Sequence, residues 1–198
     1  MRPSLEELRL DAVNRMGDVI AEAEAGLTNG TPCGDWNVRE VIEHTIGLNF
    51  GFARVLAVGT APEEAFRPRP MGRWRDSVAA IGSAAGSQEG PVTEFRVAPV
   101  SLERAFSRRD VEAMHLLDVM VHAWDVASGL GRRFEPPEAA LVVLAETAAV
   151  ISTAPLPSTS EQFAPPLALA ADEPAWPQVL RLVGRDPHWT PGEVRRRR

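Results

Sequence analysis

The stretch that decides the fold runs from Met114 to Ala127 and reads MHLLDVMVHAWDVA. A helix of this sequence carries apolar side chains on nearly every side, which is typical of a helix buried in a protein core. Four polar residues interrupt the apolar surface at spacings of three, four and three, and they form one stripe: His115, Asp118, His122 and Asp125. The stretch therefore predicts a core helix whose polar stripe must be satisfied inside the protein.

Other segments predict further helices around this one. Capping-box pairs, Ser4 with Glu7 and Asn37 with Glu40, predict two helix starts, and Ser107 with Asp110 suggests the start of the central helix. Helical spacing of apolar residues then predicts helices over about 5–27, 37–58, 73–86, 107–128, 136–153 and 173–183. Gly129 is expected just beyond the end of the central helix. Residues 60–72 are expected to form a loop, and residues 92–100 a short extended stretch or a loop.

These elements predict a mainly α fold. We expect an up-and-down bundle of four long helices over about 4–153, with an irregular C-terminal appendage over about 154–198. The 198 residues fit one compact domain, and the sequence shows no internal repeat or low-complexity linker. We therefore predict a single domain over residues 1–198.

Composition narrows the class of protein. All 21 basic residues are arginines. The net charge is −6, and this acidic balance argues against a nucleic-acid partner. The basic run Arg195–Arg198 reads as a solvated tail. A single cysteine, Cys33, excludes an internal disulfide framework. No apolar signal region and no apolar stretch of membrane-spanning length occur, so we expect a cytoplasmic protein with no membrane partner.

The polar stripe has three physical solutions. Buried imidazoles and carboxylates cost several kcal/mol unless hydrogen bonds, water in a cavity or a cation satisfy them. Asp118 and His122 are separated by four residues, which places their Cβ atoms roughly 5–6 Å apart on a helix and suits two ligands of one metal. His44 lies on the apolar face of the 37–58 helix and is the natural third ligand. Two histidines and one carboxylate are typical of zinc, iron or another first-row metal and leave a coordination position open.

Each candidate residue also has a structural interpretation. His44 could be a core histidine bonded to backbone, and Asp118 with His122 could be a buried ion pair. His115 could line a pocket or be structural, and Asp125 could orient a ligand or be structural. Cys33 precedes a helix N-terminus, but no neighbouring base is identifiable, so a structural role is favoured. The remaining expectations are a core position for Trp124, a staple for Trp36, no ligand role for His188, and an ion pair rather than a substrate contact for Arg185.

Three blocks of sequence resemble one known family. Residues 31–44 read TPCGDWNVREVIEH and resemble its opening motif TPCxxWxVRxLxxH, and residues 121–127 read VHAWDVA and resemble its VHxWDLA helix. Residues 163–166 (FAPP) and 184–189 (GRDPHW) resemble its C-terminal signatures. The family is the actinobacterial metal-binding group related to the mycothiol-dependent maleylpyruvate isomerase N-terminal domain, within the DinB-like helical bundles.

The resemblance implies a four-helix bundle with a metal at one end of its core. It places His44, Asp118 and His122 at the ligand positions, with Asp118 where the isomerase-like enzymes carry Glu. It also implies a small-molecule thiol such as mycothiol as cofactor, which would attack an unknown electrophilic substrate, and it suggests a homodimer. The expected function is a metal-dependent thiol transferase or isomerase, with zinc as the favoured metal. The alternative is a bundle that binds a metal or a small ligand without turnover.

Overall fold

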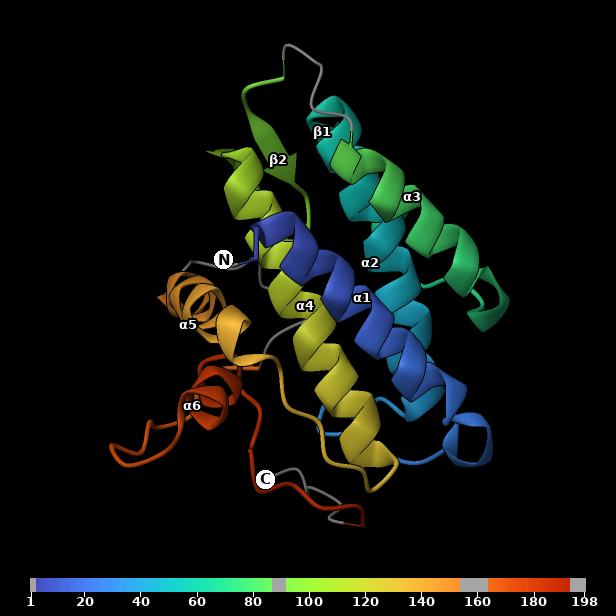
Figure 1. The fold of residues 1–198 in the computed structure, drawn as a ribbon, viewed down its shortest axis with the longest axis vertical. Helices are drawn as coiled ribbons and strands as arrows, with labels where there is room; N and C mark the ends of the chain where they lie inside the picture. Colours follow the sequence, from blue (N-terminus) through green and yellow to red (C-terminus); the bar gives the residue numbers. More distant parts are fainter. Residues whose placement is uncertain (1–2, 87–91, 154–163, 193–198) are drawn as a thin grey trace.

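The computed structural model describes residues 3–86, 92–153 and 164–192, and it is mainly helical (Figure 1). Phe163 of the C-terminal signature and the arginine run 195–198 lie outside the described residues. The longer helices are α1 (Leu5–Ala21), α2 (Val38–Val58), α3 (Trp74–Gly86), α4 (Arg108–Gly129), α5 (Glu138–Thr153) and α6 (Ala175–Leu182). Short 3-10 helices cover Glu24–Gly26, Glu63–Phe66 and Met71–Arg73. The mainly α class is confirmed.

Capping boxes start three of the helices, as the sequence predicts. In α1, the side chain of Ser4 accepts from the amide of Glu7 while the amide of Ser4 donates to the Glu7 carboxylate. Asn37 with Glu40 does the same for α2, and Ser107 with Asp110 for α4. Each box satisfies two amides that a helix start would otherwise leave without partners.

Two predicted helix ends are wrong. α1 ends at Ala21 rather than near residue 27, because Glu22 and Ala23 donate to carbonyls three residues back and tighten the chain into the following 3-10 turn. Gly129 lies inside α4, where an added Cβ would come within 2.8 Å of the Gly30 carbonyl oxygen. Gly129 therefore allows the segment around Gly30 to lie close to α4. Gly131, with φ of 68°, adopts the left-handed conformation after the helix.

A crossover joins α2 to α3. After α2, residues 62–71 return along its outer surface: Phe66 packs over Gly51, and the amide of Arg69 donates to the carbonyl of Glu43 at 2.9 Å. Arg39, near the start of α2, reaches Met71. α3 consequently begins beside the start of α2 and runs parallel to it (Figure 1).

The other two long helices run in the opposite direction. The side chain of Asn29, just after α1, donates to the Gly129 carbonyl at the end of α4, so α1 and α4 finish together. Arg108, at the start of α4, donates to the Leu56 carbonyl near the end of α2, so α2 and α4 are antiparallel. The expected up-and-down order is therefore wrong: α1 and α4 point one way, and α2 and α3 point the other way.

A small sheet packs against α2 and α4. β1 (Thr60–Ala61) pairs in parallel with β2 (Phe95–Val97), which pairs antiparallel with β3 (Ser101–Phe106). β2 agrees with the extended stretch expected in 92–100, whereas β1 falls in a predicted loop and β3 was not predicted. Phe95 of β2 lies opposite Phe106 of β3, and both side chains are buried.

α2 and α4 are the main core helices of the described residues. In the described part of the chain, α2 is the helix long and apolar enough to cross a membrane by length and composition, but 72% of its most apolar window is buried inside the protein. A core helix of a soluble protein meets the same criteria. α2 packs on α3 and α4, α1 packs on α4, and α5 links α4 to α6. The segment after α6 then brings Arg185 back to α4.

Candidate metal centre

The structure brings His44 and His122 together from two helices. The ring centroids are 5.1 Å apart and the rings meet edge to face. Trp36, in the loop before α2, packs against the other side of His44 with a centroid distance of 4.7 Å. The predicted staple residue Trp36 thus forms part of the wall around His44.

The contacts of each histidine indicate which of its ring nitrogens could bind another partner. Nδ1 of His122 lies 3.0 Å from Oδ2 of Asp125, three residues further along α4. This contact leaves Nε2 of His122 as the nitrogen for another partner. Nε2 of His44 is buried and has no hydrogen-bond partner within the described residues. A buried imidazole nitrogen without a partner is costly, and a cation would satisfy it.

Asp118 lies one helical turn before His122 and is buried, with 7% exposure. Burial raises the pKa of its carboxyl to about 7, although the nearby charge of Arg185 acts in the opposite direction. A divalent cation would favour the charged carboxylate, as it does in other metal sites. A nearby cation would therefore stabilise the buried carboxylate of Asp118.

Arg185 organises the far side of the site. Its Nε and Nη2 donate to the two carboxylate oxygens of Asp125 at 3.3 and 3.2 Å, and Nη2 also lies 2.9 Å from Sγ of Cys33. Burial raises the pKa of Asp125, but the charge of Arg185 and the hydrogen bond from His122 outweigh it and leave that pKa lowered. Burial, together with the charges of His122 and Arg185, lowers the pKa of His44 well below its usual value. Neutral His44 is the form that binds metals.

A second set of donors overlaps the first. Ligand atoms of Cys33, His122 and Asp125 lie within 4.8 Å of one another, and all three residues are buried. These donors are already engaged, because Asp125 and Cys33 both contact the Arg185 guanidinium. Burial and the charge of Asp125 also raise the pKa of Cys33 to about 12, which disfavours the thiolate a metal would bind. A metal bound by this set would have to compete with Arg185 for Cys33 and Asp125.

The other candidate residues lie elsewhere in the core or on the surface. Nε2 of His115 lies 2.9 Å from Oδ1 of Asn49, whose Nδ2 donates to Ser77, so this histidine joins a separate buried network. Trp124 is buried in the core as expected. His188 has an exposed side chain 3.4 Å from Glu173 and does not reach the site.

Sequence reasoning missed the contact of Arg185 with Cys33 and Asp125. Arg185 lies 152 residues after Cys33 and 60 after Asp125. The expected ion pair of Arg185 is present, but its partner is not a neighbour in the sequence. The resemblance of residues 184–189 to a family signature was the signal that could have pointed to Arg185.

Comparisons with known proteins relate most of the chain to other sequences. The family model "Mycothiol maleylpyruvate isomerase N-terminal domain" matches residues 10–115, which include His44 but not Asp118 or His122. Two uncharacterized proteins of Mycobacterium tuberculosis, from strains CDC 1551 / Oshkosh and H37Rv, are each 24% identical over 169 residues. These matches cover 84% of this chain and 90% of each relative. No solved structure matches the chain significantly.

Proposed function

Because the chain belongs to the mycothiol maleylpyruvate isomerase N-terminal domain family, we propose that it binds one divalent metal and uses it in thiol-dependent chemistry. The ligands would be His44, Asp118 and His122, with zinc as the favoured metal. The reaction would be a transfer to, or an isomerisation of, a small electrophile, with a mycothiol-type thiol as cofactor.

One observation carries the metal proposal. Nε2 of His44 is buried without a partner, and the ring of His122, 5.1 Å away, has its Nδ1 occupied by Asp125. A histidine whose second nitrogen is held by a carboxylate is the usual arrangement in metal sites. The two Nε2 atoms and the carboxylate of Asp118 would supply two imidazoles and one carboxylate, the donor types that zinc and other first-row metals accept.

The chain's own residues would then prepare the site for a thiol. A bound metal would lower the pKa of the thiol and would bind the resulting thiolate. Asp125 holds the His122 ring in one orientation, and Arg185 holds Asp125 through two hydrogen bonds. The positive charge of Arg185 also favours anionic groups nearby, and Trp36 limits the access of water to His44.

Metal analysis of purified variants tests the ligand set. We expect about one metal per chain in the wild type, and its loss in His44→Ala, Asp118→Ala and His122→Ala. Cys33→Ser is the matched control, because Cys33 belongs only to the competing set. Loss of metal in Cys33→Ser with retention in Asp118→Ala would assign the metal to the competing donors. A wild type that neither contains nor takes up metal would overturn the proposal.

A thiol titration tests the reaction class. We expect mycothiol to produce a sulfur-to-metal charge-transfer absorption in the cobalt-substituted protein, because a thiolate at the open position would coordinate the metal. The same titration with Asp118→Ala should give no such band. A cobalt-loaded wild type whose spectrum is unchanged by the thiol would instead favour the second candidate.

That second candidate is a bundle that binds a metal or small ligand without turnover. The burial of the proposed ligands favours it, since His44 is 5% exposed and His122 is 1% exposed. A sealed site is typical of structural metals, whereas catalytic metals keep an accessible position. We propose that the protein is cytoplasmic and that its partners are a small thiol and an electrophile. The homodimer stays a prediction, as does the lack of nucleic-acid or membrane partners.

A further inference from the structure

A basic pocket lies on the outer side of α2, away from the candidate metal centre. It has a volume of about 460 Å³ and is formed by α2, the crossover segment and the start of α3. Three of its lining residues are arginines, Arg54, Arg69 and Arg73, and one is acidic, Glu64. The protein as a whole has a net charge of −6, so a pocket with an excess of positive charge departs from the average surface.

Two of the three guanidinium groups of this pocket are available to a ligand. Within the described residues, the side chains of Arg54 and Arg69 have no ion-pair partner. Glu64 is paired outside the group, 3.8 Å from Arg67. Arg73 is fixed by a hydrogen bond from its Nε to Asp76 and lies over the ring of Phe50. Arg54 and Arg69 therefore leave positive charge in the pocket that an anion would balance.

The walls of the pocket are held firmly. The crossover segment lies so close to α2 that a Cβ on Gly47 would come within 2.2 Å of the Arg67 carbonyl oxygen. A Cβ on Gly51 would meet the ring of Phe66 equally closely. The Arg69 amide is also bonded to α2 through the Glu43 carbonyl. The backbone that carries Arg69 is therefore fixed relative to Arg54 before any ligand arrives, which reduces the entropy cost of binding.

We propose that this pocket binds a small molecule that carries a phosphate or pyrophosphate group. Guanidinium groups match the oxygens of phosphates through paired hydrogen bonds, and the two groups without an ion-pair partner suit an anion with more than one charge. The volume is that of a small-molecule site, and the Phe50 ring offers an apolar surface for the rest of the ligand.

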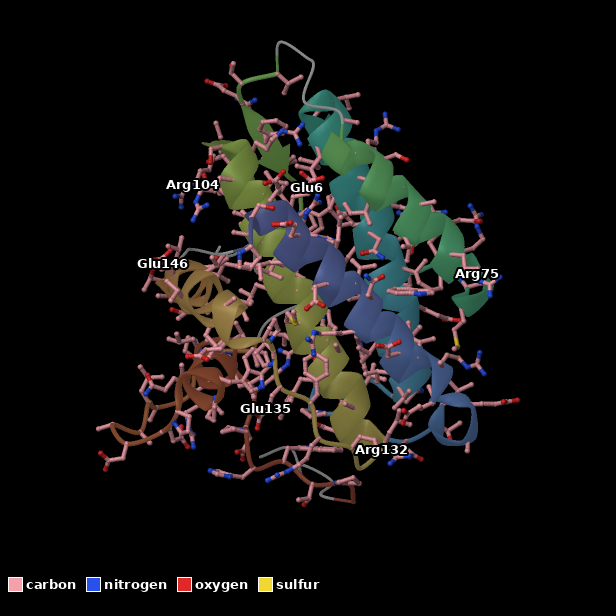
Figure 2. All side chains as sticks on the ribbon, in the orientation of Figure 1. Glu6, Arg75, Arg104, Arg132, Glu135 and Glu146 are labelled. Carbon is pink, nitrogen blue, oxygen red and sulfur yellow. The ribbon has the colours of Figure 1, made fainter. Side chains whose placement is uncertain are left out.

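Calorimetric titration with inorganic pyrophosphate tests the proposal, at an ionic strength held constant with sodium chloride. We expect saturable binding by the wild type and affinity weaker by roughly tenfold or more in Arg54→Gln/Arg69→Gln, since each lost guanidinium removes charge-assisted hydrogen bonds. Arg104→Gln is the charge-matched control. Arg104 lies on the opposite side of the molecule from Arg75, which marks the α3 side (Figure 2).

The outcomes separate site binding from general attraction. Unchanged affinity in Arg104→Gln together with the loss in the double variant would support the pocket. No saturable heat with the wild type, or an equal loss of affinity in both variants, would overturn the proposal. The substituted side chains are exposed, so unchanged melting temperatures should show that the variants are folded. Metal content is a separate readout, because the pocket shares no residue with either metal-donor set.

Discussion

Arg9 provides the sharpest test of the energetics of this core. It lies on α1 with 1% exposure, and none of its three side-chain nitrogens has a hydrogen-bond partner within the described residues. Burial lowers its pKa, while the charges of Glu112 and Glu6 act in the opposite direction. We predict that Arg9→Met, which keeps an unbranched chain but removes the charge, stabilises the protein.

The expected size follows from the cost of burying a lone ion. Such burial costs several kcal/mol, and replacing buried ionic groups with apolar side chains of similar volume has gained about 1–4 kcal/mol elsewhere. The attraction of Glu112 and Glu6 offsets part of the cost, so we expect a gain of about 1–3 kcal/mol. For a chain of this length, each kcal/mol raises the melting temperature by roughly 2–4 °C.

Urea and thermal unfolding of the metal-free protein would measure this change. Arg15→Met is the control, because Arg15 lies on the same helix, is 41% exposed and forms a surface pair with Asp11. Its substitution should change the unfolding free energy by no more than about 0.5 kcal/mol. Destabilisation of Arg9→Met by more than about 1 kcal/mol would refute the reasoning and indicate that Arg9 is satisfied by a bound anion or water.

Two further predictions concern glycine and the single thiol. Gly47→Ala should lower the free energy of unfolding by about 1–3 kcal/mol, because its Cβ would clash with the backbone of the crossover segment. Gly82→Ala has open space around it and should raise the free energy of unfolding by up to about 1 kcal/mol. Chemical denaturation of both variants measures these changes, and changes of the same sign would contradict the prediction. Burial raises the pKa of Cys33 to about 12, so the neutral thiol persists as pH rises and only about 10⁻⁴ of it is ionised at pH 8. Iodoacetamide at pH 8 should therefore label native protein far more slowly than protein unfolded in urea, and comparable rates would show an accessible, ionised thiol.

Local signals in the sequence predicted the helices well. Capping pairs and apolar spacing located α2 and α4 to within one or two residues, because those signals act within a few positions of the helix ends. The direction of α3 was not predictable in this way. It depends on the crossover packing against Gly47 and Gly51, and nothing in residues 62–71 alone indicates that they lie along α2. The single-domain prediction stays a prediction.

The candidate site was predicted in part for the same reason. The spacing within α4 placed Asp118, His122 and Asp125 on one stripe, and the apolar face of α2 placed His44 inward. The structure brings His44 to His122, while the assignment of the metal to these residues stays a prediction. The contact of Arg185 with Asp125 was missed because it depends on how the segment after α6 returns to α4, which is a long-range property of the fold.

The position of Arg185 in the chain sets the order in which the site can be assembled during synthesis. Helices α1 to α4 leave the ribosome first and can pack with one another, but Asp125 then faces Cys33 without the cation that balances it. Synthesis delivers the chain from the N-terminus at roughly 5–20 residues per second, so α1 to α4 are complete seconds before Arg185 emerges. A nascent protein of this family can therefore have its helical core in place while its site is still electrostatically incomplete, and the arrival of Arg185 completes it.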